Sequence, residues 1–122
     1  MPVKLKRAYE KPDDQDGTRI LVDGLWPRGI KKEDLQISAW EKGIAPSPAI
    51  RKWYGHDPEK WPEFRERYRE ELGQPPRQQV LERLAGLAEH GNLTLVFGAR
   101  DAEHSNAAVI AEMLDEALKA SE

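Results

Sequence analysis

The 122-residue chain contains no cysteine. Disulfide bonds, cysteine metal ligands and thiol nucleophiles are therefore excluded as sources of stability or chemistry. The chain also lacks an apolar run of about 18 residues, which a membrane-spanning helix requires, and residues 1–11 lack the apolar core of a signal peptide. These absences lead us to expect a cytoplasmic protein that does not enter a membrane.

The chain has no strong excess of one charge sign: it contains 22 acidic and 19 basic residues, so its net charge is -3. The two signs are interleaved, and no zinc-finger, RNA-recognition or clear helix-turn-helix pattern is present, so nucleic acid is not an expected partner. Four tryptophans, three tyrosines and two phenylalanines supply bulky core material. The length predicts a single domain over residues 1–122.

Three segments carry strand patterns. Residues 3–9 alternate apolar and polar side chains, which predicts a half-buried strand at a sheet edge, and residues 18–23 predict a more buried strand. Residues 93–97 are almost continuously apolar, as in a parallel strand covered on both faces. We therefore predict a small layered α/β domain, in which helices flank a mostly parallel sheet of about three strands. The all-helical alternative would require residues 93–97 to be helical.

Helix signals fill most of the remaining chain. Ser38 and Glu41 fit a capping box, which predicts a short helix there. Ser47 and Asp57 each precede a proline, and this pairing of an N-cap with proline predicts two further helix starts. Longer helices are predicted over residues 61–72, 77–90 and 107–118, where apolar residues recur at helical spacing.

Two polar loops follow predicted strands, at residues 23–32 and 98–106. Ligands of open α/β sheets bind beyond the carboxyl ends of the strands, so these loops form the candidate site. Neither loop carries the phosphate-binding pattern GxxxxGK[ST] or the dinucleotide pattern GxGxxG. The predicted ligand-binding residues are Asp23, Trp26, Arg28, Arg100 and Asn106.

In this hypothesis the two arginines hold a small anion, which can contain phosphate, and free amides near residues 104–106 assist them. Asp23 and Asp101 orient the arginines. The same residues also admit purely structural roles: Asp101 or Ser105 as the N-cap of the last helix, the arginines as partners of acidic neighbours, and the tryptophans as core residues.

His56 and His104 are the acid–base candidates, Asp101 is a third candidate for a catalytic role, and whether the protein is an enzyme stays open. The two histidines lack the spacing of a helical metal site, so we expect neither a metal nor a cofactor. A triad of Ser105, His104 and Asp101 is rejected, because the three residues lie on one turn and no G-x-S-x-G motif is present.

Several segments resemble the YeaO-like family of small bacterial domains of unknown function. The most specific is Leu-Trp-Pro-Arg-Gly at residues 25–29, and residues 3–9, 45–47, 51–58 and 93–106 also resemble the family. The resemblance implies a single cytoplasmic α/β domain and no established reaction. The family usually has an arginine where this chain has Gly24, so one positive charge is missing from the predicted anion site. Distant relatives carry cysteines in the loop after the last strand, which this chain lacks.

Two other functions remain as alternatives. A protein-interaction module without a small-molecule site would use its exposed charged helices to meet a partner, and its polar loop residues would be structural. A nucleic-acid-binding regulator would use the basic first strand with Lys31 and Lys32, and its binding would weaken as the salt concentration rises.

Overall fold

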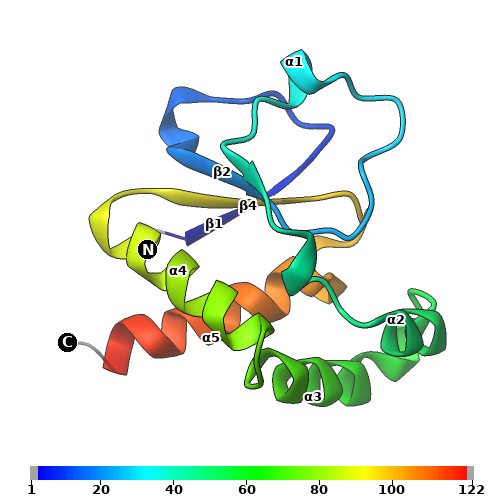
Figure 1. Ribbon diagram of the computed structural model, residues 1–122. Helices are drawn as coiled ribbons and strands as arrows, with labels where there is room; N and C mark the ends of the chain where they lie inside the picture. Colours follow the sequence, from blue (N-terminus) through cyan, green and yellow to red (C-terminus); the bar gives the residue numbers. More distant parts are fainter. Residues whose placement is uncertain (1–2, 121–122) are drawn as a thin grey trace.

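The computed structural model describes residues 3–120, which form a parallel sheet with its long helices on one side (Figure 1). The strands are β1 (Val3–Arg7), β2 (Thr18–Leu21), β3 (Ala39–Trp40) and β4 (Leu93–Phe97). The α-helices are α1 (Lys32–Leu35), α2 (Pro48–Tyr54), α3 (Trp61–Leu72), α4 (Arg77–His90) and α5 (Asn106–Ala120). Short 3-10 helices lie at η1 (Asp14–Asp16), η2 (Lys42–Ile44), η3 (Pro58–Lys60) and η4 (Ala102–His104).

The sheet has the strand order β1-β4-β2-β3, and all its pairings are parallel. Strand β4 lies inside the sheet and all five of its residues are buried, as its continuous apolar sequence predicts. Val3 of β1 and Thr18 of β2 both pair with Leu93, so the three strands start level. The predicted α/β class is confirmed, and β1 is an edge strand as expected.

The prediction of about three strands is one strand short. Residues 39–40 form the edge strand β3 beside β2, where the sequence predicts a short helix. Ser38 does not cap a helix, because its hydroxyl accepts a hydrogen bond from the Arg19 amide at 3.4 Å. The indole of Trp40 donates to the backbone oxygen of Asp23 at 2.7 Å. Pairing with β2 therefore overrides the local helix signal.

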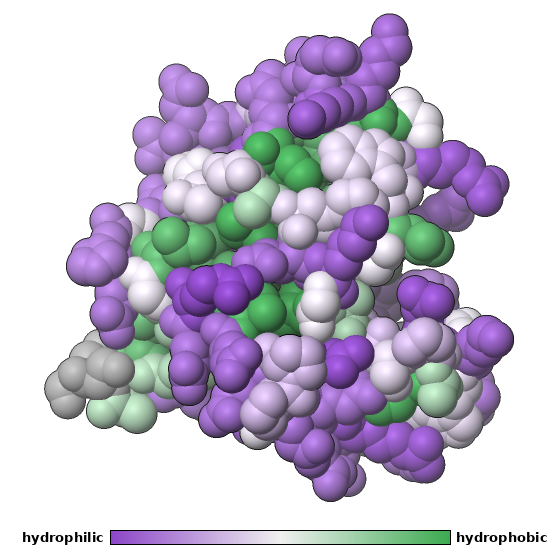
Figure 2. Space-filling model, in the orientation of Figure 1, coloured by the Kyte–Doolittle hydropathy of each residue, from purple (hydrophilic) through white to green (hydrophobic). Residues whose placement is uncertain are grey.

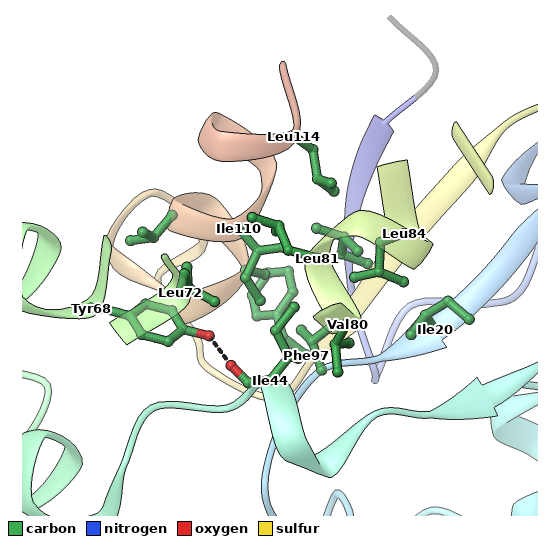
Figure 3. Close-up of a cluster of buried hydrophobic side chains, with 14 of the residues drawn as sticks. Ile20, Ile44, Tyr68, Leu72, Val80, Leu81, Leu84, Phe97, Ile110 and Leu114 are labelled. Carbon is green, nitrogen blue, oxygen red and sulfur yellow. Dashed lines mark hydrogen bonds between the residues drawn. The ribbon is translucent and has the colours of Figure 1, made fainter. Parts of the chain in front are cut away.

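The main core lies between the sheet and helices α3, α4 and α5 (Figure 3). Phe97 and Ile20 reach it from the sheet, and Leu84 and Ile110 reach it from the helices. The hydroxyl of the fully buried Tyr68 donates to the backbone oxygen of Ile44, which ties α3 to η2. The helices at residues 77–90 and 61–72 have the bounds that their apolar spacing predicts.

The other face of the sheet is covered by the loop that contains α1. A smaller cluster lies there, formed by Ala8, Leu21, Leu35 and Val96 with partly buried residues packed around them. Figure 2 shows hydrophobic residues over the middle of this view, with hydrophilic residues around them. No helix in residues 3–120 combines the length and the apolar character needed to cross a membrane.

A buried carboxylate, that of Asp16, ties the strands together at their amino ends. Its side chain is fully buried and pairs with Lys4 at 2.9 Å, Lys6 at 3.1 Å and Arg19 at 2.7 Å. Burial opposes ionisation of Asp16, but hydrogen bonds from these three cations outweigh it and hold the pKa of the carboxyl well below its usual range. The Asp16 backbone oxygen accepts from the Thr94 hydroxyl at 2.7 Å, so the network also reaches β4.

Replacing Asp16 by asparagine is expected to lower the free energy of unfolding at pH 7 by about 3–5 kcal/mol, because the buried Arg19 and the partly buried Lys6 lose their counter-charge. The folded carboxyl binds a proton less readily than the unfolded one. Its contribution is therefore complete above the ordinary aspartate pKa of about 3.9 and is lost as the pH falls below it. Urea denaturation between pH 7 and pH 3 measures both effects.

Asp14→Asn is the matched control, since Asp14 lies in the same 3-10 helix but is exposed. An Asp16→Asn variant as stable as Asp14→Asn, with an unchanged dependence on pH, would contradict the structural role of this carboxylate.

Candidate ligand-binding cavity

A cavity of about 290 Å³ lies at the carboxyl ends of β2 and β4. The loop after β2 contributes Asp23 to its lining, and the segment between β4 and α5 contributes Gly98 and His104. Arg51 and His56 line it from α2 and the turn that follows. Figure 1 shows α2 beside the segment that joins β4 to α5. The cavity therefore lies where parallel sheets usually bind ligands.

The two predicted loops meet through hydrogen bonds at the base of this cavity. The Gly98 amide donates to Oδ2 of Asp23 at 2.8 Å, and the Asn106 side chain donates to the Val22 backbone oxygen at 3.1 Å. A Cβ on Gly98 would lie 3.3 Å from the same carboxylate oxygen, so glycine permits this close approach. Burial raises the pKa of Asp23, although hydrogen bonds from Gly98 and Asn106 and the charge of His56 oppose the shift.

The cationic side of the cavity is built by α2. Ser47 caps this helix by accepting from the Ile50 amide at 3.4 Å, with Pro48 at its first position, as the sequence predicts. The Arg51 guanidinium reaches over Gly24, where a Cβ would lie 3.3 Å from Nη1. It makes no hydrogen bond or ion pair with any residue in 3–120, so its donors remain open to a ligand.

His56 follows the helix in a strained backbone conformation. Gly55 ends α2 with a left-handed φ of 54°, and His56 has a φ of 58°. Glycine adopts this region at no steric cost, whereas a side chain at Cβ makes it unfavourable. Two successive left-handed residues turn the chain so that the His56 side chain lines the cavity.

His104 also lines the cavity and is held by Asp101. Its Nδ1 lies 2.6 Å from Oδ2 of Asp101, and this hydrogen bond lowers the pKa of the exposed Asp101 carboxyl. The imidazole packs edge-on against Trp61, with ring centroids 5.1 Å apart. The Tyr54 hydroxyl donates to the His104 backbone oxygen at 2.9 Å, and burial raises the pKa of Tyr54.

The structure brings together only part of the predicted site. Four of the predicted residues line the cavity, namely Asp23, His56, His104 and Asn106, and Asp101 adjoins it through His104. Three others do not line it. Trp26 packs against Trp40 and donates to the Ile30 backbone oxygen, and the side chains of Arg28 and Arg100 are exposed, without a partner among the described residues. Ser105 caps α5 by accepting from the Ala108 amide at 3.2 Å.

Arg51 was not among the predicted site residues. In the sequence it belongs to a short helix whose basic residues are typical of a solvated face. No local pattern distinguishes Arg51 from the other basic residues of this helix, and only the structure shows that its side chain lines the cavity. Within residues 3–120, no group of three histidine or acidic side chains is arranged to hold a metal ion.

Comparison with known proteins identifies the family. Residues 2–122 match the family model described as "Inactive DUF488-N3 subclade". Protein YeaO of Escherichia coli K12 is 42% identical over 114 residues, which cover 93% of this chain and 97% of that protein. Protein Rv3073c of Mycobacterium tuberculosis H37Rv is 42% identical over 113 residues, which cover 93% of each chain. Both relatives carry the name "Uncharacterized protein".

No solved structure gives a significant match to the chain. The family model and the two relatives span nearly all of the sequence, including the segments at residues 25–29 and 51–58 that resemble YeaO-like proteins. The chain belongs to the YeaO-like family, within the inactive DUF488-N3 subclade.

Proposed function

We propose that this protein binds a small anionic ligand in the cavity between the loops after β2 and β4. The observation that carries the proposal is the Arg51 guanidinium in the cavity wall, which has no hydrogen-bond or ion-pair partner in the part of the chain that the structure describes. A guanidinium offers five donors in a planar fork that matches a carboxylate or a phosphate. Arg51 thus takes the role that the sequence analysis gave to Arg28 and Arg100.

The rest of the lining restricts the ligand further. The half-buried Asp23 carboxylate also lines the cavity as an acceptor, which suits a ligand that carries a hydroxyl or amino group besides its anionic group. Tyr54 and Phe64 stack with ring centroids 4.2 Å apart and supply an apolar wall. A small, partly apolar cavity with a few convergent polar groups has the general character of a ligand site. Sugar phosphates and related hydroxylated anions combine the required groups.

Binding without turnover is the favoured form of this proposal. The family description contains the word "inactive", and the chain has no cysteine to act as a nucleophile. Acid–base catalysis is a second candidate, favoured by the 2.6 Å contact between Asp101 and His104 at the cavity. A carboxylate that holds one imidazole nitrogen fixes the role of the other, as a general acid or base requires. Consumption of a bound compound, abolished by His104→Ala, would establish this second function.

Arg51→Ala is expected to abolish the rise in melting temperature that a bound anion produces. A screen of phosphate, sulfate, nucleotides and sugar phosphates by thermal unfolding measures this effect. A ligand at about 100 times its Kd stabilises the folded protein by about 2.7 kcal/mol, which corresponds to several degrees in a domain of this size.

Arg28→Ala and Arg100→Ala are matched controls, because both arginines are exposed, as Arg51 is, but lie outside the cavity lining. Both controls should keep the full thermal shift. Loss of the shift in either control, with retention in Arg51→Ala, would move the anion site away from this cavity. A screen without any shift would count against ligand binding and favour a protein-interaction module.

His56→Gly is expected to stabilise the unliganded fold by about 1 kcal/mol while weakening anion binding. Glycine relieves the left-handed strain at this position, and the substitution removes a cavity side chain. Opposite changes in stability and affinity distinguish a ligand-binding residue from a structural one. Urea denaturation and a binding titration measure the two quantities.

His56→Asn is the companion variant, since asparagine tolerates the left-handed region but cannot carry a charge. It should fold with nearly wild-type stability and bind the anion weakly. A His56→Gly variant that loses stability and keeps its affinity would assign His56 a structural role instead.

A further inference from the structure

A second hollow lies between the edge strand β1 and helix α5, and it shares no lining residue with the cavity described above. Its volume is about 410 Å³. Leu5 of β1 and Ala108 and Ala111 of α5 give it apolar walls, and the carboxylates of Glu103 and Asp115 also line it. We refer to this hollow as the β1–α5 groove.

Strand β1 forms one side of this groove, and the backbone groups on its outer edge face no other strand of residues 3–120. Among the strands of residues 3–120, β1 pairs only with β4, and the Ala8 amide donates to the Phe97 backbone oxygen of β4 at 2.7 Å. Because backbone groups alternate in direction along a strand, the N–H and C=O of Leu5 point away from β4. The next outward amide, that of Arg7, is already capped by the Glu10 carboxylate at 2.9 Å. Leu5 is therefore the position at which an added strand can pair.

Of the three acidic side chains that line the groove, one is paired with cations within residues 3–120. Glu112 also lines it but pairs with Arg65 and Arg69 of α3. Glu103 and Asp115 form no ion pair within residues 3–120. Oδ1 of Asp115 is moreover buried without a hydrogen-bond partner among the described residues, a state that native proteins usually avoid because an unsatisfied acceptor is unfavourable. A cation in the groove would compensate this charge.

We propose that the β1–α5 groove binds an extended, basic segment of a partner protein, which adds to the sheet at β1. Its backbone pairs with Leu5, and every second side chain faces α5. An arginine or lysine there meets Asp115 and Glu103, while its aliphatic stem packs on Ala108 and Ala111. This arrangement combines strand addition, which supplies affinity, with charge recognition, which supplies specificity.

A second copy of this chain does not fit the same edge. Antiparallel pairing of two β1 strands about Leu5 would place Lys4 of one copy opposite Lys6 of the other. Like charges directly opposite each other destabilise a strand pair, and lysines on an edge strand oppose self-association. The occupant is therefore a different chain, with basic side chains toward α5 and neutral or acidic side chains toward the lysines.

An acetylated and amidated octapeptide of alternating arginine and threonine is the test probe. We expect it to bind the full chain, to shift the amide NMR signals of Ala108 and Ala111, and to slow hydrogen exchange at Leu5. Asp115→Asn should weaken binding about tenfold, as expected for loss of a charged hydrogen bond. Glu103→Gln provides a second variant, since Glu103 is exposed. Glu89→Gln, an exposed change on α4, should leave the affinity unchanged.

A peptide with glutamate in place of arginine should not bind. Equal binding of the two peptides, no binding of either, or equal affinity of Asp115→Asn and Glu89→Gln would each overturn the proposal. Binding that leaves exchange at Leu5 unchanged, or dimerisation of the chain through β1, would also overturn it. None of these outcomes depends on the anion-binding cavity, so the two proposals are tested separately.

Discussion

The sheet of this protein is organised around the buried carboxylate of Asp16. Three cations from β1 and β2 converge on it, and its backbone oxygen holds β4, so one residue fixes the amino ends of the three longer strands. Loss of Asp16 would remove the counter-charge of all three cations at once, whereas loss of a single cation would leave Asp16 with two partners. Parallel strands that start level also end close together, and this alignment brings the loops after β2 and β4 to one place.

The candidate cavity at the opposite ends of the strands has different physical properties. Asp23 and Gly98 join its loops, but Arg51 and His56 form no ion pair with any other residue of the range 3–120, unlike the members of the Asp16 network. His56 also keeps an unfavourable backbone angle that glycine would relieve. Backbone strain of this kind lowers the stability of a fold and commonly occurs where a ligand is bound, whereas the exposed Arg51 side chain is solvated and carries no such cost. At the amino ends of the strands the buried charge of Asp16 is paired with three cations, whereas at the carboxyl ends Arg51 and His56 line a cavity. This contrast is a second reason to propose that the ligand binds at the carboxyl ends.

Elements with strong local signals were predictable from the sequence. The apolar run of β4, the proline-marked start of α2 and the periodic pattern of α4 each specify their structure locally. Strand β3 was not predictable, because Ala39 and Trp40 become a strand only by pairing with β2. The loops that form the site could be located by the rule for parallel sheets. Which arginine lines the cavity could not be predicted from the sequence. Arg51 reaches the cavity because of the orientation of α2, which no local sequence pattern encodes.

The central claim is that an anion occupies the cavity beside Arg51. Titration of ¹⁵N-labelled protein with inorganic phosphate and then with a sugar phosphate tests it most directly. The account predicts saturable shifts of the Arg51 side-chain signal and of the amides of Gly98 and Asn106, with unchanged signals at Arg28 and Arg100. Saturable shifts that spare Arg51 and Gly98, or no saturable shift with either compound, would contradict the account.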